Sequence, residues 1–184
     1  MLNIPELQEY LQAHTRKTQF RFDALEVYNV PTTGNDLERY LAGEPEPDMD
    51  RKGRWLDKLR DEQARGLYRY KVWAVPTPLI DRTRFACEWG YAYNVKAGED
   101  IRILDLGKKP WPEGLLRHDF YLLDDEQVVR MHYDDEGHFV GAEVLGDEVL
   151  PKYREARDIA WAAAEPFEPW WAARPEEHRA NRAS

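Results

Sequence analysis

Three strand-like runs joined by two short acidic turns restrict the fold of this chain more than any other feature. The runs span residues 120–123, 128–133 and 138–145. Residues 124–127, which begin with Asp124-Asp125, separate the first two runs, and residues 134–137 separate the last two. Asp is common in tight turns, and Gly137 supplies the positive φ that a hairpin turn needs. The pattern therefore predicts an antiparallel meander in the second half of the chain.

A helix followed directly by a strand is predicted in the first half. Apolar residues at helical spacing cover residues 53–65, Gly66 is a typical helix C-cap, and residues 67–75 form an increasingly apolar strand. Further helices are expected at residues 4–13, after Asn35, and at residues 148–164. Together these elements predict an α+β fold, in which helices flank a mixed, mainly antiparallel sheet and a long helix follows the meander.

Residues 83–93 are compatible with two secondary structures. Phe85, Trp89 and Tyr93 have helical spacing, whereas their aromatic character favours a strand. Both remain open, with the aromatic content favouring the strand. Elsewhere, strands are expected at residues 101–106 and in the extended stretch 19–30.

A chain of 184 residues is expected to form one domain. We predict a helical extension at residues 1–18, a globular domain at 19–172 and a disordered tail at 173–184. The tail is polar and follows Pro175, and chain ends of this kind are often disordered.

The net charge of −9 argues against nucleic acid as a direct partner, because phosphate binding needs a basic face. An acidic surface is instead suited to a protein partner. Cys87 is the single cysteine, so neither an intramolecular disulfide nor a cysteine-rich metal site is expected. The sequence contains no signal peptide and no apolar run long enough to cross a membrane. We therefore expect a cytoplasmic protein, and its oligomeric state remains open.

Charged residues interleave with aromatic ones between residues 82 and 91, where no turn accounts for them. They form either a pocket that binds a polar ligand or a structural ion pair, since an unpaired buried charge is too costly. Asp119 is the most plausible distant contributor. The candidate ligand-binding residues are Arg82, Arg84, Glu88, Trp89, Tyr91 and Asp119.

Other residues have simpler structural explanations. Asp119, Asp124 and Asp125 could bind Mg²⁺ or act as acid and base, but Asp124 and Asp125 are adequately explained as turn residues. His132 and His138 lie on opposite arms of a hairpin, and a lone Cys87 is more often a small buried side chain. The sequence contains no nucleophile elbow, phosphate-binding glycine loop, HExxH motif or dinucleotide fingerprint. We expect no metal and no cofactor.

Three segments resemble a family of uncharacterised actinobacterial proteins. They are Leu79-Ile-Asp-Arg-Thr-Arg-Phe-Ala-Cys-Glu-Trp-Gly-Tyr, Asn94-Val-Lys-Ala-Gly-Glu-Asp-Ile-Arg-Ile-Leu-Asp and Asp119-Phe-Tyr-Leu-Leu-Asp-Asp. The likeness covers residues 20–171. Such proteins are often encoded beside helix-turn-helix regulators of a toxin–antitoxin-like type, so the resemblance implies a regulatory or accessory role.

The order of elements also resembles a phospholipase D-like domain, which would be a single α/β domain. That family cleaves phosphodiesters with a His-x-Lys-(x)₄-Asp motif. The nearest match here, His132-Tyr-Asp134, lacks the lysine, so the likeness implies the fold without its chemistry.

Three functions follow as hypotheses. The first is a non-enzymatic regulatory protein that binds a protein partner, such as a helix-turn-helix regulator. The second is a hydrolase of phosphodiesters or nucleotides that uses Asp119, Asp124, Asp125 or His132. The third is a small-ligand sensor whose pocket contains Arg84, Glu88, Trp89 and Tyr91.

Overall fold

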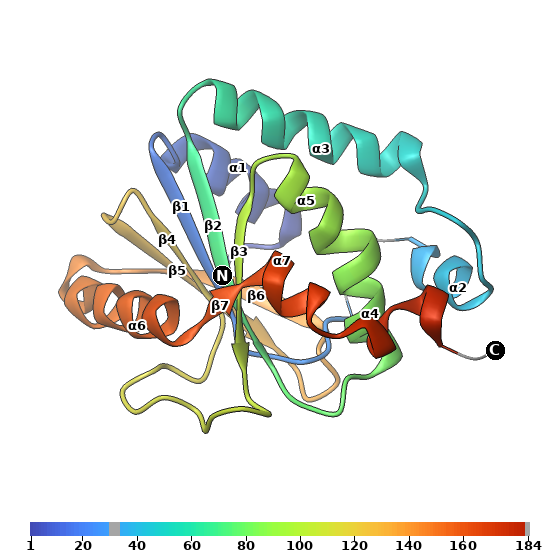
Figure 1. Ribbon diagram of the computed structural model, residues 1–184. Coiled ribbons are helices and arrows are strands. Elements are labelled where there is room, and N and C mark those ends of the chain that lie inside the picture. The colour runs from blue at the N-terminus through green and yellow to red at the C-terminus, as the bar shows by residue number, and fades with distance from the viewer. Residues whose placement is uncertain (30–33, 183–184) are drawn as a thin grey trace.

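An open sheet of seven strands, in the order β6-β5-β4-β1-β2-β3-β7, forms the centre of the molecule (Figure 1). The computed structural model describes residues 1–29 and 34–182. In chain order, the elements are α1 (Ile4–His14), β1 (Thr18–Asp23), α2 (Asp36–Leu41), α3 (Met49–Ala64), β2 (Tyr68–Val75), α4 (Asp81–Phe85), the π-helical η2 (Ala86–Tyr91), α5 (Ala92–Lys96), β3 (Asp100–Asp105), β4 (Phe120–Leu123), β5 (Gln127–Tyr133), β6 (Phe139–Leu145), the 3₁₀ turn η3 (Asp147–Val149), α6 (Leu150–Ala163), β7 (Glu165–Pro166), α7 (Phe167–Ala172), and the 3₁₀ turns η4 (Pro175–Glu177) and η5 (Arg179–Asn181).

The sheet is mixed, as predicted. Strands β1, β2 and β3 run parallel, and helices connect them, whereas the other four neighbouring pairs are antiparallel. The α+β class is therefore confirmed. The helix–strand unit is also present, because Gly66 follows α3 with a φ of 84° and lets the chain turn directly into β2.

The meander of β4, β5 and β6 is confirmed together with its turn chemistry. Asp124 and Asp125 both have positive φ, at 52° and 59°, and together with Glu126 they form the three-residue connection between Leu123 and Gln127. Gly137 has a φ of 80° in the second turn. The sheet half that the sequence predicts best is thus the half determined by local turns.

One face of the sheet carries the largest apolar core. Phe20 and Phe22 of β1 and Phe120 of β4 are fully buried there, packed against Tyr153 and Ala156 of α6. Helix α6 lies across this side of the strands, and α1 and α3 lie on the other side (Figure 1). Burial of these aromatic side chains supplies much of the driving force for folding.

The opposite face is divided into two apolar clusters. Over the meander, Leu7 of α1 packs on Tyr121 and Leu123. Over β2 and β3, the segment around Cys87 packs together with Phe167, Trp170 and Trp171 of α7. Between the two clusters, the central strands β1 and β2 present polar and charged side chains instead.

The strand favoured for residues 83–93 is wrong, because residues 81–96 are helical throughout. The helical spacing decides the matter: Phe85 and Trp89 lie on one face and contact Tyr40, while Cys87 and Tyr91 lie on another and enter the core. The aromatic residues reflect burial on two sides of a helix rather than a pleated strand.

Helix α1 and residues 173–182 both contact the rest of the described chain. Helix α1 begins with a capping box between Asn3 and Glu6 and buries Leu7 against the meander, so it covers part of the sheet. The structure places residues 173–182, where the sequence predicts a disordered tail, against α2 and α4. Residues 30–33 and 183–184 lie outside the described residues.

Candidate functional site

A buried ion-pair network occupies the middle of the second sheet face. Asp23, which is 1% exposed, pairs with Lys71 at 2.5 Å between Oδ2 and Nζ, and also with the Arg21 guanidinium. Burial opposes ionisation of Asp23, but the two cations outweigh it and lower the pKa of the carboxyl. Burial likewise opposes the charged form of Lys71, yet Asp23 raises its pKa. All three groups are therefore charged at neutral pH.

Strand register explains this arrangement. Polar and aromatic residues alternate along β1, so Arg21 and Asp23 face one side of the sheet and Phe20 and Phe22 face the other. Arg21 is opposite Lys71 in the parallel pairing of β1 with β2. Because these are interior strands covered on both faces, the charges are buried rather than solvated.

Asp119 borders the network from the start of β4. It is 2% exposed, and its Oδ1 accepts a hydrogen bond from the Ala24 N–H at 2.8 Å. Burial and the neighbouring Asp23 carboxylate raise the pKa of Asp119 to about 7, although Arg21, the Ala24 N–H and the Tyr28 hydroxyl act in the opposite direction. Two adjacent carboxyls thus have pKa values shifted in opposite directions.

Tyr91 borders the network from the helical segment. The Lys71 Nζ lies 4.9 Å from the centre of the Tyr91 ring, and the ring also packs edge-on against Trp73. Burial raises the pKa of the Tyr91 hydroxyl. Of the six residues that the sequence predicts for a site, Tyr91 and Asp119 therefore adjoin the same buried charges.

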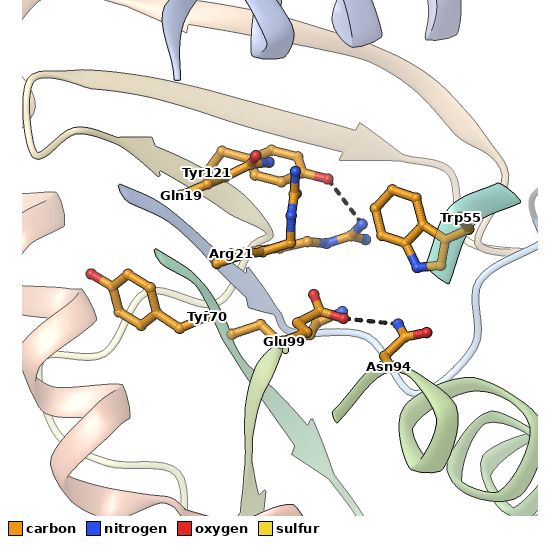
Figure 2. Close-up of a pocket in the computed structure, with 9 residues that line it drawn as sticks. Gln19, Arg21, Trp55, Tyr70, Asn94, Glu99 and Tyr121 are labelled. Atoms are coloured by element: carbon orange, nitrogen blue, oxygen red, sulfur yellow. Dashed lines mark hydrogen bonds between the residues drawn. The ribbon is translucent and has the colours of Figure 1, made fainter. Parts of the chain in front are cut away.

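A small, partly open pocket lies on this charged face of the sheet, and we call it the sheet-face pocket. Its volume is about 170 Å³. It is lined by Gln19, Arg21, Trp55, Arg69, Tyr70, Lys71, Asn94, Glu99 and Tyr121. Figure 2 shows the Arg21 side chain extending toward Trp55, with Asn94 and Glu99 across from it and the Tyr70 ring pointing away.

The two arginines of the sheet-face pocket are held by hydrogen bonds to neighbouring side chains. Arg21 donates from Nη1 to the Tyr121 hydroxyl at 3.0 Å, and Arg69 donates from Nε and Nη2 to Glu62 at 2.9 and 2.7 Å. Glu62 is itself buried, so the Arg69 side chain is fixed by a charge-assisted pair. The positions of these guanidinium groups are thus set before any ligand binds.

On the opposite wall, Asn94 links two charged groups. Its Nδ2 donates to Glu99 at 2.8 Å, and its Oδ1 accepts from the Lys52 Nζ at 2.8 Å. Burial lowers the pKa of Lys52 to about 8, with nearby Glu99 and Asp36 opposing that effect. Lys52 therefore titrates closer to neutral pH than an ordinary lysine.

Gln19 is the least satisfied polar group of the sheet-face pocket. It is 3% exposed, yet its side-chain amide makes no hydrogen bond to any of the residues that the structure describes. Most polar groups inside proteins are hydrogen-bonded. The Gln19 amide is therefore available to a polar ligand that enters the pocket.

A second, more open cavity of about 680 Å³ lies at the end of β5, and we call it the strand-end cavity. Asp119 and Tyr133 belong to its wall, together with His118 and the acidic hairpin at residues 134–137. His118 bonds the Tyr153 hydroxyl at 2.9 Å, and burial lowers its pKa to about 4. The cavity and the sheet-face pocket thus lie at two ends of one network.

Four predicted site residues lie elsewhere and bind the protein's own C-terminal segment or a loop. Arg84 pairs with Glu177 at 2.7 Å, and Glu88 accepts the Arg179 N–H at 2.6 Å. Arg82 donates to the Tyr28 carbonyl, and Trp89 packs edge-on against Tyr40. These charges have the geometry of the structural ion-pair alternative.

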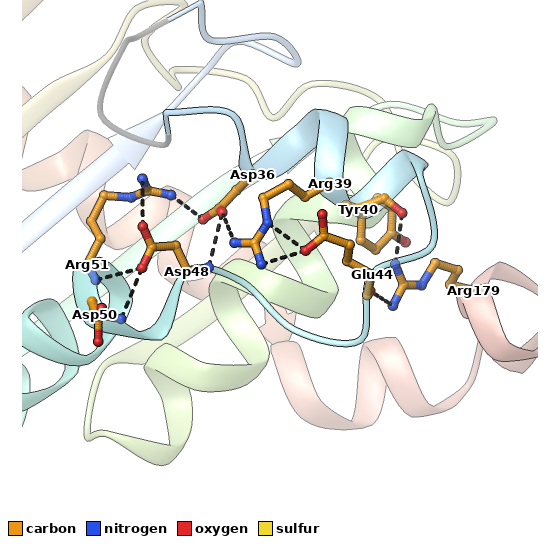
Figure 3. A network of polar contacts seen from close by, with 8 residues as sticks. All are labelled: Asp36, Arg39, Tyr40, Glu44, Asp48, Asp50, Arg51 and Arg179. Carbon is orange, nitrogen blue, oxygen red and sulfur yellow. Dashed lines mark hydrogen bonds and ion pairs between the residues drawn. The ribbon is translucent and has the colours of Figure 1, made fainter.

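The same contact region continues into a polar network around α2 (Figure 3). Arg179 donates to the Tyr40 and Glu44 carbonyls at 2.8 and 2.7 Å. Arg39 pairs with Glu44, and Asp36 pairs with Arg51 at 2.6 Å. The network connects residues 173–182 to the loop before α3, so the charged residues of this region have a structural role.

The remaining candidates also have structural positions. Asp124 accepts three backbone N–H groups, from residues 16–18, which lower its pKa although burial opposes them. Asp125 pairs with Arg157 at 2.7 Å. Both lie at the opposite end of β4 from Asp119, so the three carboxylates do not form one cluster. Burial raises the pKa of the Cys87 thiol.

The two histidines of the second hairpin each have a carboxylate neighbour. His132 lies 3.3 Å from Glu143 across the strands, and His138 lies 3.1 Å from Asp134. Within the described part of the chain, no group of three or more His, Cys, Asp and Glu side chains is placed to hold a metal ion. The residues that a metal-dependent hydrolase would use are therefore dispersed.

The residues that the sequence interpretation missed are Gln19, Arg21, Lys71 and Glu99. The sequence predicts an extended stretch over residues 19–23, but alternating polar and apolar residues do not by themselves tell whether the polar face is buried. The available signal was the pair of neighbouring strands with cations at alternating positions, Arg21 in β1 and Arg69 and Lys71 in β2. Its meaning depends on strand order, which the sequence does not display.

The fold and site define a mixed α+β protein with a charged pocket on the inner strands of its sheet. The chain belongs to the family described as a domain of unknown function (DUF6879), whose model matches residues 5–172. The match includes α1 and ends at α7. A search of curated proteins found no similar sequence.

Across residues 1–29 and 34–182, no helix is both long enough and apolar enough to cross a membrane.

Proposed function

We propose that this protein is a non-enzymatic sensor that binds a small polar ligand in the sheet-face pocket. The observation that carries the proposal is Gln19, a residue of the pocket wall that is 3% exposed as a whole and whose side-chain amide has no hydrogen-bond partner among the described residues. A ligand that pairs with this amide would gain a hydrogen bond that the described protein groups do not make.

The cost of the surrounding network supports the same proposal. Asp23 and Lys71 are almost fully buried, and desolvating such a pair often cancels its Coulombic attraction. Well-packed apolar residues would fold as stably at these positions. Buried charges beside a pocket therefore favour a binding role over a purely structural one.

Binding is favoured over catalysis by the condition of the reactive groups. Asp23 is neutralised by Arg21 and Lys71, Asp124 caps backbone N–H groups, and the Cys87 thiol is buried. Each is engaged in structure rather than held next to a nucleophile and a base. The expected setting is the cytoplasm, which the lone cysteine supports.

The test is a thermal-shift screen of neutral, anionic and cationic metabolites against the wild-type protein and Gln19→Leu. A ligand of the native state raises Tm, and removal of the amide should abolish that rise. Gln19→Leu itself should leave the Tm of the free protein unchanged or higher, because an unpartnered buried amide is replaced by an apolar group. Gln8→Leu on the exposed side of α1 is the matched control. The proposal is contradicted if the screen finds no compound that raises the Tm of the wild-type protein but not that of Gln19→Leu.

A second candidate function is pairing with a strand of a protein partner, such as a regulator. Strand β6 is the edge of the sheet, and Val140 and Val144 on it are 57% and 41% exposed. On the side away from β5, Leu2 bridges to this strand at Ala142. Exposed apolar edge strands are templates for strand addition. Val144→Lys should abolish a specific partner's capture from native lysate while leaving Tm unchanged; equal capture by the variant would refute this role.

A further inference from the structure

The chemical class of the ligand follows from what lines the sheet-face pocket, and this inference rests on the proposed function. Three cationic side chains line the pocket, Arg21, Arg69 and Lys71, against one carboxylate, Glu99. Their partners Asp23 and Glu62 are not part of the lining. The surface that a ligand meets is therefore more positive than the network as a whole.

Several residues that line the pocket also carry N–H groups without a hydrogen bond to the described protein. The Arg21 guanidinium uses Nε and Nη1 in bonds to protein groups, and Arg69 uses Nε and Nη2. The second terminal nitrogen of each, Nη2 of Arg21 and Nη1 of Arg69, has no hydrogen bond within the described part of the chain. The Trp55 indole N–H and the Gln19 amide likewise have none there. Guanidinium groups held in fixed positions suit the planar or tetrahedral oxygens of carboxylates and phosphates.

The size and walls of the pocket limit the anion. A volume of about 170 Å³ is below the 300–1,000 Å³ typical of drug-sized ligands. The Trp55 and Tyr121 rings add apolar surface beside the cations, and Figure 2 shows both rings near the Arg21 side chain. A compact anion with few carbon atoms fits such a site, and a nucleotide does not.

We propose that the sheet-face pocket binds a compact oxyanion, a small carboxylate or phosphate, between the Arg21 and Arg69 guanidinium groups with the Gln19 amide as a further donor. Glu99, fixed by Asn94, faces the ligand from the opposite wall and repels a second negative group there. The oxyanion end is thus bound on the arginine side of the pocket.

Isothermal titration with malonate, inorganic phosphate and the neutral analogue malonamide tests this assignment and separates carboxylate from phosphate. We expect at least one of the two anions to bind, and malonamide to bind at least tenfold more weakly. Gln19→Leu should raise the Kd for that anion by 10- to 100-fold, as expected for loss of a hydrogen bond to a charged group. Trp55→Phe, which keeps an aromatic ring and removes the N–H, should raise the Kd by a smaller factor. Gln8→Leu should have no effect.

The outcomes separate this inference from the proposed function. Equal binding of malonamide and malonate, unchanged anion affinity in Gln19→Leu, or no binding of either anion overturns the oxyanion assignment. A neutral or cationic metabolite whose thermal shift requires Gln19 would overturn it while supporting the sensor. Absence of any Gln19-dependent ligand in the wider screen contradicts both.

Discussion

The Asp119 carboxyl offers the sharpest test of the buried network, because its charge opposes folding. Asp119 is 2% exposed and lies beside the ionised Asp23. Its pKa rises from 3.8 to about 7. In the unfolded chain it ionises near 4, whereas in the folded protein it keeps its proton until about pH 7. The stability that this protonation contributes is present below about pH 4 and is lost as the pH rises to 7.

The magnitude follows from the size of that change. At 1.36 kcal/mol per pKa unit, ionised Asp119 destabilises the folded protein by roughly 4 kcal/mol above pH 7. About 3 kcal/mol of this difference arises between pH 5 and pH 8. Asp119→Asn removes the titration while its Oδ1 can still accept the Ala24 N–H. The variant should therefore gain about 3 kcal/mol relative to wild type between pH 5 and pH 8.

Urea unfolding of both proteins at pH 5 and pH 8 measures this difference. An unpartnered amide nitrogen in the variant costs about the same at both pH values, so the change with pH isolates the carboxyl. Asp135→Asn, an exposed acid in the strand-end cavity wall, is the control and should show no such change. A difference between wild type and Asp119→Asn that stays within about 0.5 kcal/mol at both pH values would refute the burial of Asp119 beside a charged Asp23.

Three further measurements test other parts of the structure. Lys71→Met should lower the unfolding free energy by about 3 kcal/mol, because Asp23 loses a buried partner. Arg60→Met, in an exposed pair, should lower it by less than about 0.5 kcal/mol. Equal losses in urea unfolding would contradict the buried network. Asp124→Ala should cost about 2 to 4 kcal/mol, since three N–H groups and a positive-φ position lose their carboxylate, and Asp124→Asn should be far milder; the opposite order would exclude this capping role. Cys87 should react with a thiol reagent only at the rate of unfolding, because its thiol is buried with a raised pKa; rapid labelling of the native protein would show that the segment is open.

The parts of the fold that the sequence predicts are those determined by neighbouring residues. The meander depends on positive φ at Asp124, Asp125 and Gly137, and these residue types favour that conformation wherever they occur. The same holds for the Gly66 cap between α3 and β2. The secondary structure of residues 83–93 is not determined locally in this way. Aromatic side chains are common both in strands and in buried helices, and only the packing against surrounding elements distinguishes the two.

The candidate site depends on contacts between residues far apart in the sequence, and it was predicted only in part. Asp119 and Tyr91 lie beside the network, but its centre is Asp23 with Arg21 and Lys71, which belong to strands 50 positions apart that pair in register. Polar residues at alternate positions of a strand usually indicate that one face of the strand is exposed to solvent. Only the placement of β1 and β2 inside the sheet turns those positions into buried ones.

If the proposed sensor function is right, the electrostatic continuity of the network provides a measurable response to ligand binding. Arg21 contacts Asp23 and Tyr121 and lines the sheet-face pocket, while Asp119 feels both Asp23 and Arg21 from the strand-end cavity. The positive charge of Arg21 lowers the pKa of Asp119. An anion bound at Arg21 would offset that effect, so the pKa of Asp119 should rise further. Binding near pH 7 should then be accompanied by proton uptake, which appears as a dependence of the titration heat on the buffer's ionisation enthalpy. That dependence should vanish in Asp119→Asn, and its persistence there would place the proton on another group, with Lys52 the next candidate.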